Sequence, residues 1–374
     1  MFRLLLFLFP VMTLSQSLPQ KLQAVLNAHF IPHEPGIALL VMDAGKVVLS
    51  KGYGMAYTRK PMAITPKTAF RMASVSKQFT AMAILLLEKE GRLRLSDPLS
   101  RYFPELPAWS QQVTIRHMIT HTSGIIDGES LLTNEEGRML PENPWVHNLL
   151  DTNYQHLRQI EDRDHLRLLQ ATDSTYFVPG SQFRYSNSAY CLLALIVEKT
   201  ARTPFAAFLT ERIFKPLGMK GAMAFQPPAP IPNRAFGYAR DGSEKWYFND
   251  QSQTSATLGD GGVYLSLNDY ARWYSALLND TLIPIKKVQE TLFSVAGPQH
   301  RYGAGWFFDT EMWFHSGSTC GFSNFVIAMP ASGKLVAWFS NRADDYAAFR
   351  KIQTLLIEEG FLKEAVWHWH EQTQ

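Results

Sequence analysis

Residues 70–81 read Phe-Arg-Met-Ala-Ser-Val-Ser-Lys-Gln-Phe-Thr-Ala, and no glycine or proline interrupts the chain from there until Gly91. Residues 79–87 are apolar on nearly every face, which predicts a buried helix that ends at a Gly91 cap. Ser74 and Lys77 stand three residues apart at its start and share one face. Burial would lower the pKa of Lys77 towards that of a general base, and N–H groups at the helix start would stabilise negative charge on Ser74. The alternative is a capping serine beside a solvated lysine.

Two Tyr-x-Asn triplets offer partners for such a nucleophile. Tyr185-Ser-Asn187 follows Pro179-Gly180 and leads into an apolar helical pattern, whereas Tyr247-Phe-Asn249 lies in a polar loop. A tyrosine can share the proton traffic of a serine and a lysine, and an asparagine amide can hold both the lysine and a substrate carbonyl. For an isolated triplet of this kind, a turn is the favoured explanation.

A third motif, His315-Ser316-Gly317-Ser318, ends a predicted strand. Glycine at that place lets another backbone or a substrate approach the strand edge closely. The backbone N–H of Ser318 could then join that of Ser74 as an oxyanion hole. A strand end with a hydrogen-bonded histidine is the alternative.

Strand patterns lie at both ends of the chain, and helical patterns lie between them. A hairpin is predicted over residues 36–50 and short strands over 306–339, with a helix over 346–359. We therefore expect one sheet built from residues 18–90 and 257–374, with a mainly helical domain inserted at 91–256.

Composition and the first residues bound the class of protein. The 374 residues carry 36 Lys+Arg against 33 Asp+Glu, a net charge of +3, and 46% are hydrophobic. These values exclude disorder and argue against nucleic acid as a partner. One arginine followed by a short apolar stretch predicts a cleaved signal peptide over residues 1–17, and hence a periplasmic or secreted protein. Later apolar runs are too short for a transmembrane helix. The oligomeric state stays open.

The combination of motifs closely resembles the serine β-lactamase-like superfamily, in the branch of class C β-lactamases, penicillin-binding esterases, DD-peptidases and D-aminopeptidases. The resemblance covers nearly the whole chain after the first residues. Its matching segments run in order along the sequence: residues 70–81, 115–124, 179–187, 216–219, 259–264, 302–306 and 315–317.

The resemblance implies an α+β fold of the β-lactamase/transpeptidase type, an antiparallel sheet flanked by helices, and an acyl-enzyme mechanism. Ser74 would attack a carbonyl, Lys77 and Tyr185 would move the proton, and Asn187 would position the substrate. The N–H groups of Ser74 and Ser318 would hold the oxyanion. Neither a metal nor a cofactor is implied. The partner would be a small molecule or a peptide, including one derived from the cell wall.

The third motif departs from the pattern, because β-lactamases and many penicillin-binding proteins carry Lys-Thr-Gly where this chain has His315-Ser316-Gly317. A histidine near its reference pKa is largely neutral at pH 7, whereas lysine is a permanent cation. We therefore expect a serine hydrolase of small esters, amides or D-residue peptides. The alternatives are a β-lactamase or DD-carboxypeptidase, and a non-hydrolytic penicillin-recognising sensor or cell-wall binding protein.

Three further features complete the sequence-based expectations. His117 and His121 stand one helical turn apart, but without a third ligand nearby we expect no metal there. Residues 127–164 read as an irregular excursion that forms one wall of the cleft. Cys191 is expected to be a free buried thiol, and whether it meets Cys320 stays open.

Overall fold

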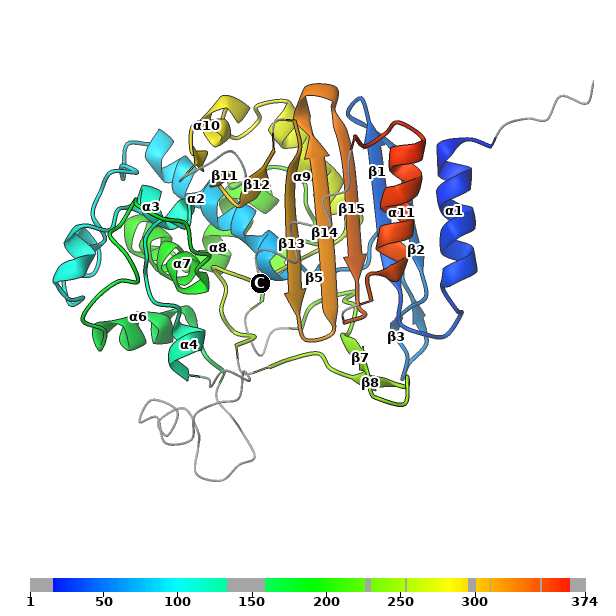
Figure 1. Cartoon of the computed structure of the whole chain (residues 1–374), viewed down its shortest axis with the longest axis horizontal. Coiled ribbons are helices and arrows are strands. Elements are labelled where there is room, and N and C mark those ends of the chain that lie inside the picture. The colour runs from blue at the N-terminus through cyan, green and yellow to red at the C-terminus, as the bar shows by residue number, and fades with distance from the viewer. Residues whose placement is uncertain are drawn as a thin grey trace, which may run out of the picture.

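The computed structural model describes residues 16–132, 159–225, 230–252, 254–294, 301–309, 311–343 and 345–363. Its centre is an eight-stranded antiparallel sheet (Figure 1). In spatial order its strands are β10 (Phe293–Ser294), β11 (Arg301–Gly303), β12 (Trp306–Phe308), β13 (Trp313–Thr319), β14 (Phe322–Met329), β15 (Lys334–Ser340), β1 (Ile37–Asp43) and β2 (Lys46–Tyr53). Strands from the two ends of the chain meet where β15 pairs with β1.

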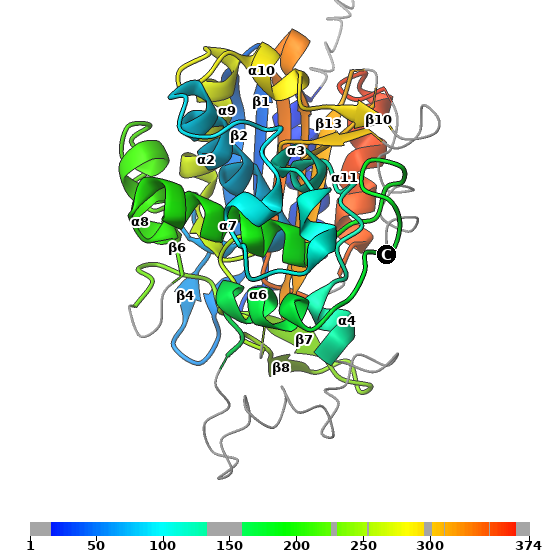
Figure 2. The same cartoon turned by 90° about the vertical axis from the view of Figure 1, so that its left-hand side faces the viewer.

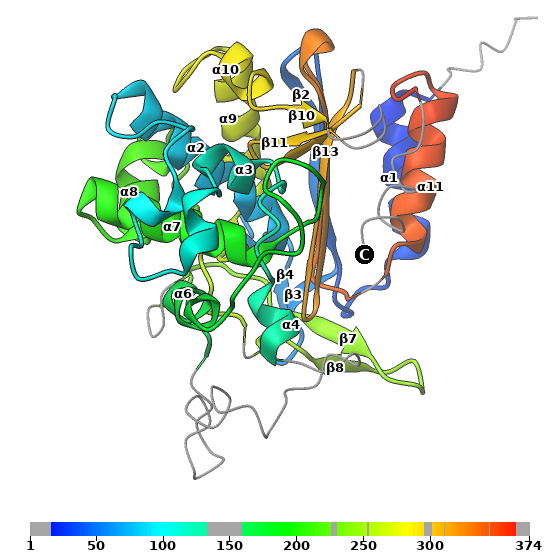
Figure 3. The ribbon, with the colours of Figure 1, turned by 60° about the vertical axis from the view of Figure 1, so that its left-hand side comes forward.

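Helices cover both faces of this sheet, as the nearly edge-on view in Figure 3 shows. Helices α1 (Leu18–His29) and α11 (Ala347–Glu358) pack side by side on one face, and α2 (Lys77–Lys89) and α9 (Leu267–Leu278) lie on the other. Every residue of β14 is buried, as are six of the seven in β1, because no face of these strands meets water. The observed class is the predicted α+β fold with an antiparallel sheet.

The helical part lies in front of α2 (Figure 2). Its central helix is α7 (Asn187–Ala201), which is buried over most of its length and packs against α2, α3 and α6. The neighbouring helices are α3 (Ile115–Ile119), α4 (Gly128–Leu132), α6 (Asp162–Gln170) and α8 (Phe205–Leu209), and α10 (Ile285–Gln289) follows α9.

In the described part of the chain, three small sheets lie outside the central sheet. The first holds β5 (Phe70–Arg71), β9 (Val263–Leu265) and β6 (Met223–Ala224), so that the strand before the nucleophile motif pairs with a segment almost two hundred residues later. The others are β3 (Met55–Tyr57) with β4 (Met62–Ala63), and β7 (Tyr238–Arg240) with β8 (Trp246–Phe248).

The predicted hairpin over 36–50 and the strands over 306–339 are confirmed, but two local predictions were wrong. The α-helix does not begin at Ser74: residues Ala73–Ser76 form a 3-10 turn, and α2 begins at Lys77. The segment 127–164 is not irregular at its ends, because it opens with α4 and closes inside α6.

Some predictions stay untested. Residues 133–158, the middle of that segment, lie outside the described part of the chain, as do residues 1–15 of the predicted signal peptide. Among the described residues, none of the helices combines the length and the hydropathy needed to cross a bilayer. The domain boundaries at 90/91 and 256/257 stay predictions.

Gln78 ties the nucleophile helix to α9, and its replacement tests this tie. Its buried side-chain oxygen accepts hydrogen bonds from Tyr270 Oη at 3.1 Å and from Trp273 Nε1 at 3.0 Å. Gln78→Met leaves both donors buried without an acceptor, so we expect the free energy of unfolding to fall by about 2–4 kcal/mol in denaturant titrations. The same substitution at the exposed Gln112 should cost less than about 0.5 kcal/mol. Equal costs at the two positions would contradict this account.

Candidate active site

Lys77 is the centre of the candidate site, and it is completely buried. Its Nζ donates to Ser74 Oγ at 3.1 Å, to Asn187 Oδ1 at 2.8 Å and to the backbone oxygen of Asp260 at 2.9 Å. An ammonium group has three N–H donors, and all three are used here. These bonds join α2, the start of α7 and the loop before β9 at the oxygen of one serine.

The backbone around Ser74 is held in an unusual shape by β9. Ala73 has φ +47°, a left-handed conformation that side chains other than glycine, asparagine and aspartate rarely adopt. Val263 fixes the turn from both sides: its carbonyl accepts from the Met72 N–H, and its N–H donates to Ser76 Oγ at 3.0 Å. Strain of this kind persists only where surrounding contacts over-determine the backbone, and it is common at functional sites.

Tyr185 and Asn187 are positioned by the segment before α7. The Ser186 N–H donates to His121 Nδ1 at 3.1 Å, and the His121 ring lies 4.1 Å from that of Tyr185. The Asn187 N–H donates to Asp127 at 3.0 Å, which attaches the start of the 127–164 segment to the site. The structure therefore brings the first Tyr-x-Asn triplet to Lys77.

The second triplet lies elsewhere, because Tyr247 belongs to β8 and its side chain is exposed. His117 also serves a local purpose, since its Nδ1 accepts the Thr114 N–H at the start of α3. Cys191 and Cys320 are both free thiols, and Cys191 is buried as expected.

The charge state of Lys77 differs from the prediction. Burial lowers the pKa of Lys77, but the Tyr185 oxygen when ionised and the Asp260 carboxylate raise it by more, so the net pKa lies above its usual value. The expected lowering of the Lys77 pKa is not found, because the prediction took no account of these two partners. The role of Lys77 as a general base stays a prediction. When protonated, its Nζ lies at hydrogen-bond distance from Ser74 Oγ and can stabilise negative charge there.

Tyr185 lies against this cation, with Lys77 Nζ 4.8 Å from its ring centre. Burial raises the pKa of the Tyr185 hydroxyl, and Lys77 and Ser74 lower it in part, so the net pKa stays above its usual value. Within the described residues the hydroxyl oxygen is buried and meets no partner at full hydrogen-bond geometry. A neutral phenol beside Ser74 is therefore available to pass a proton on.

Strand β13 supplies the opposite wall. On one side it pairs with β14 along its whole length, and on the other side it pairs with β12 only through Trp313 and Phe314. On that second side, the rest of the strand contacts the turn that holds Ser74. A Cβ on Gly317 would come within 2.2 Å of the Met72 oxygen and 3.2 Å of the Ser74 nitrogen. Only glycine lets the strand pass this close, as its place in the motif suggested.

His315 packs among the aromatic rings beside the site, with its ring centre 6.2 Å from that of Tyr185. Its side chain is buried, its Nδ1 lies 2.5 Å from the Ser316 oxygen, and its Nε2 lies 3.0 Å from Tyr302 Oη. Burial lowers the pKa of His315 to about 3, so the ring is neutral. Nδ1 therefore carries the proton and donates to Ser316, and Nε2 accepts from Tyr302.

A pocket of about 250 Å³ opens beside Ser74. It includes Ser318 and Asn187 from the predicted set, but not Tyr185 or His315. Its lining also contains residues to which the sequence analysis gave no role: Arg71, Thr254, Thr257, Asp260 and Thr319. Arg71 and Asp260 stand inside the quoted motif segments, but only the fold shows that they face one cavity.

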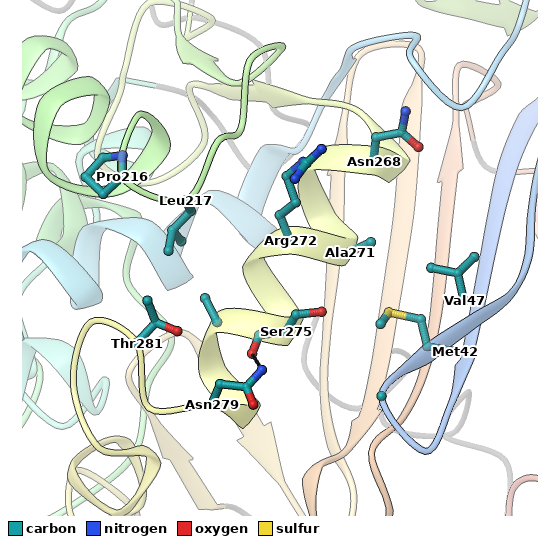
Figure 4. Close-up of a pocket in the computed structure, with 12 residues that line it drawn as sticks. Met42, Val47, Pro216, Leu217, Asn268, Ala271, Arg272, Ser275, Asn279 and Thr281 are labelled. Atoms are coloured by element: carbon teal, nitrogen blue, oxygen red, sulfur yellow. Dashed lines mark hydrogen bonds between the residues drawn. The ribbon is translucent and has the colours of Figure 1, made fainter.

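A second pocket, of about 660 Å³, lies between the β1–β2 hairpin, α9 and the segment at Pro216–Leu217 (Figure 4). None of its lining residues lines the pocket beside Ser74. Arg272 of α9 is its one ionisable side chain. Its lining holds no lysine, histidine, tyrosine or carboxylate that could activate the Ser275 or Thr281 hydroxyl, so the candidate active site is the smaller pocket.

Behind Lys77, Asp162, Cys191 and Asp260 bring three potential ligand atoms within 4.8 Å of one another. Their chemistry does not favour a cation. Burial raises the pKa of the Cys191 thiol well above its usual value and that of Asp162 to about 7, so both groups tend to keep their protons. Lys77 already supplies a positive charge beside Asp260. The cluster is therefore better suited to share protons than to bind a metal.

Comparison with known proteins agrees with this geometry. The family model described as Beta-lactamase matches residues 25–359. The chain belongs to the β-lactamase family. Protein flp of Staphylococcus aureus (strain MW2) is 30% identical over 332 residues, which cover 84% of this chain and 61% of that protein. The chain spans less than two thirds of the length of that relative. Penicillin-binding protein 4* of Bacillus subtilis (strain 168) is 28% identical over 353 residues, which cover 89% of this chain and 74% of that protein.

Two solved structures show the same β-lactamase-family fold. The penicillin-binding protein from Bacillus halodurans has a TM-score of 0.74 and 23% identity, and the match covers 89% of this chain and 99% of that one. D-Amino acid amidase from Ochrobactrum anthropi SV3 has a TM-score of 0.71 and 21% identity, covering 92% and 99%. At such identities the likeness establishes the fold.

The buried Asp162 predicts a pH-dependent stability. Its folded-state pKa of about 7 lies above the usual 3.8, so the stability it confers when protonated is fully present below pH 4 and is lost as the pH rises to 7. We expect the wild type to lose up to about 4 kcal/mol through this group over that range. Asp162→Asn should remove that loss, because both the Leu258 and the Gly259 N–H groups reach Oδ1, where the amide oxygen can still accept from them.

The measurement is denaturant unfolding at pH 4, 5.5 and 7.5. Asp173→Asn, the same substitution at an exposed carboxyl group, should keep the wild-type slope. An Asp162→Asn variant with the wild-type slope would show that this group does not titrate differently on folding.

Proposed function

We propose that this protein is a serine acyl hydrolase that forms an acyl-enzyme on Ser74. The observation that carries the proposal is the Lys77 ammonium group, which donates at once to Ser74 Oγ and to Asn187 Oδ1. A structural capping serine would not need a buried cation bonded to its side-chain oxygen. Membership in a family of mainly serine hydrolases supports the same conclusion.

In the proposed acylation, Ser74 Oγ forms a bond to the substrate carbonyl carbon, and the bond to the leaving group breaks. The Ser74 proton passes to Tyr185 Oη while the Tyr185 proton passes to the leaving group, so Tyr185 ends neutral. Lys77 keeps its three protons and stabilises the charge that develops on Ser74 Oγ. In deacylation, a water molecule attacks the acyl carbon and its proton passes to Tyr185 Oη. The Tyr185 proton passes to Ser74 Oγ as the bond between Ser74 and the acyl group breaks.

The backbone N–H groups of Ser74 and Ser318 are proposed to hold the oxyanion. Support comes from the closeness of Gly317 to the Ser74 nitrogen and from the presence of Ser74 and Ser318 in one pocket. His315 is proposed to position Tyr302 through the hydrogen bond between His315 Nε2 and Tyr302 Oη. The Tyr302 ring lies 4.4 Å from the ring of His121, which packs against Tyr185.

The proposed substrates are small esters, amides or peptides with a D-residue. A neutral, buried His315 provides no cation where β-lactamases carry lysine, which makes β-lactamase and DD-carboxypeptidase activity secondary. The fold shared with a D-amino acid amidase is compatible with amide substrates. The alternative function is that of a penicillin-recognising sensor, which is acylated without turnover. The following test distinguishes the two functions.

Ser74→Ala tests the proposed nucleophile. We expect the wild type to hydrolyse 4-nitrophenyl acetate over many turnovers, and the variant to lose at least about 10³-fold in kcat/KM with its unfolding curve unchanged. Replacing the exposed Ser332 by alanine should leave the rate unchanged. Retained activity in Ser74→Ala would disprove the proposal, and one acylation without turnover would favour the sensor.

Tyr185→Phe tests the proton relay through its dependence on the leaving group. The quantity to compare is kcat/KM, which reports acylation. An alkoxide must be protonated as it leaves, so we expect a loss of about 10²–10⁴-fold in kcat/KM for an ethyl ester. A nitrophenolate leaves without a proton, so the 4-nitrophenyl ester of the same acid should lose less and keep only the loss that comes from Tyr185 as the acceptor of the Ser74 proton. Tyr190→Phe is the matched control, because its hydroxyl donates to Ile119 and not towards Ser74. Equal losses for both esters in Tyr185→Phe would contradict the relay.

A further inference from the structure

Arg71 is a buried cation without a counter-ion in the wall of the candidate active site. Its side chain lines the pocket beside Ser74, and the residue is 2% exposed. Nη2 donates to the Ser255 oxygen at 2.8 Å, Nη1 reaches Gln251 Oε1 only at 3.4 Å, and the buried Nε has no partner. A guanidinium group has five N–H donors, so most of them lack an acceptor of good geometry.

No carboxylate of the described residues forms an ion pair with Arg71. Asp250, one residue before Gln251, is paired with Arg234. Asp260 lines the same pocket but lies more than 4.0 Å from the guanidinium group, and its buried Oδ1 meets no hydrogen-bond partner in the ranges that the structure describes. Arg71 is the one basic side chain among the described lining residues, and Asp260 is the one acidic side chain.

A buried charge without a partner is costly, and breaking up a buried ion pair typically costs several kcal/mol. Proteins keep such a charge where a ligand supplies the opposite one, since charge-assisted hydrogen bonds to guanidinium are strong and directional. Thr254 and Thr319 also line the pocket and carry hydroxyl groups, whereas the Thr257 hydroxyl already donates to the Thr254 oxygen. This donor set fits a carboxylate.

The position of the pocket tells which part of the substrate carries that carboxylate. Tyr185, which protonates the leaving group in the proposed mechanism, does not line it, whereas Asn187, Ser318 and Ser74 do. The leaving group must lie near Tyr185, so the pocket receives the acyl part. At about 250 Å³ it lies near the lower end of the sizes seen for small-molecule sites.

We propose that Arg71 binds a carboxylate on the acyl part of the substrate, so that the preferred substrates are monoesters or monoamides of short dicarboxylic acids. The inference rests on the proposed acyl-enzyme function and narrows its substrate class. In this proposal the cation that binds the substrate is Arg71, in the strand before the nucleophile. It takes the part of the lysine that β-lactamases carry at the position of His315.

The test compares two esters that differ in one charge: the 4-nitrophenyl monoester of adipic acid and the corresponding ester of adipamic acid, after subtraction of spontaneous hydrolysis. We expect the wild type to prefer the carboxylate ester by at least tenfold in kcat/KM. Arg71→Met should lower this ratio by at least tenfold, and Arg71→Lys should keep part of it. Gln251→Met is the matched control, because it removes a neutral partner of Arg71 and should change the ratio less than about threefold.

The outcomes separate the inference from the proposed function. Hydrolysis of both esters at equal rates by the wild type would overturn the inference and leave the proposed function standing, whether or not Arg71→Met folds. Equal losses for both esters in Arg71→Met would show that Arg71 is only a structural tie to the loop at Ser255. Hydrolysis of neither ester would count against the proposed function.

The anion site is then tested without catalysis, by calorimetry of Ser74→Ala with monomethyl adipate and with methyl adipamate. Tighter binding of the carboxylate by at least tenfold, lost in Ser74→Ala/Arg71→Met and kept in part in Ser74→Ala/Arg71→Lys, supports the inference. Equal affinities, or no detectable binding of either compound, overturn it.

Discussion

The three hydrogen bonds of the Lys77 ammonium group hold the candidate site together. They connect the helix behind the nucleophile, the start of α7 and the loop before β9, three segments that are far apart in the sequence. Since Lys77 is fully buried, each of these acceptors is needed to offset the loss of water. The sheet and the helical part must therefore be correctly docked before Ser74 has its cation. Fold and chemistry depend on the same contacts.

The close approach of β13 to the Ser74 turn is the second constraint. The strand leaves β12 after Phe314 and lies against the backbone at Met72, where Gly317 has no room for a side chain. Because α2 is in turn tied to α9 through Gln78, the serine lies between a fixed strand and a fixed helix. Such rigidity is what positions oxyanion donors before a substrate arrives. The strained φ of Ala73 is the local cost of this arrangement.

The sequence predicts those features that depend on local pattern. The hairpin at 36–50, the late strands and the buried helix after Ser74 follow from periodicity and short-range spacing, whereas the order of the motifs was part of the family resemblance. Features set by distant residues do not follow. The raised pKa of Lys77 depends on Tyr185 and on Asp260, which lies 183 residues away, and the lowered pKa of His315 depends on burial and on nearby Lys77. Arg71 was visible in the motif, but its lack of a counter-ion appears only in the fold.

The central claim is that Ser74 Oγ is the atom that carries the acyl group. The most direct measurement is intact-mass spectrometry of the protein rapidly quenched during reaction with an activated ester or a penicillin, followed by peptide mapping. The account predicts one acyl adduct, on the peptide that contains Ser74, which appears with the burst of product and disappears as turnover ends. An adduct on another residue, or turnover with no adduct at any quench time, would contradict it.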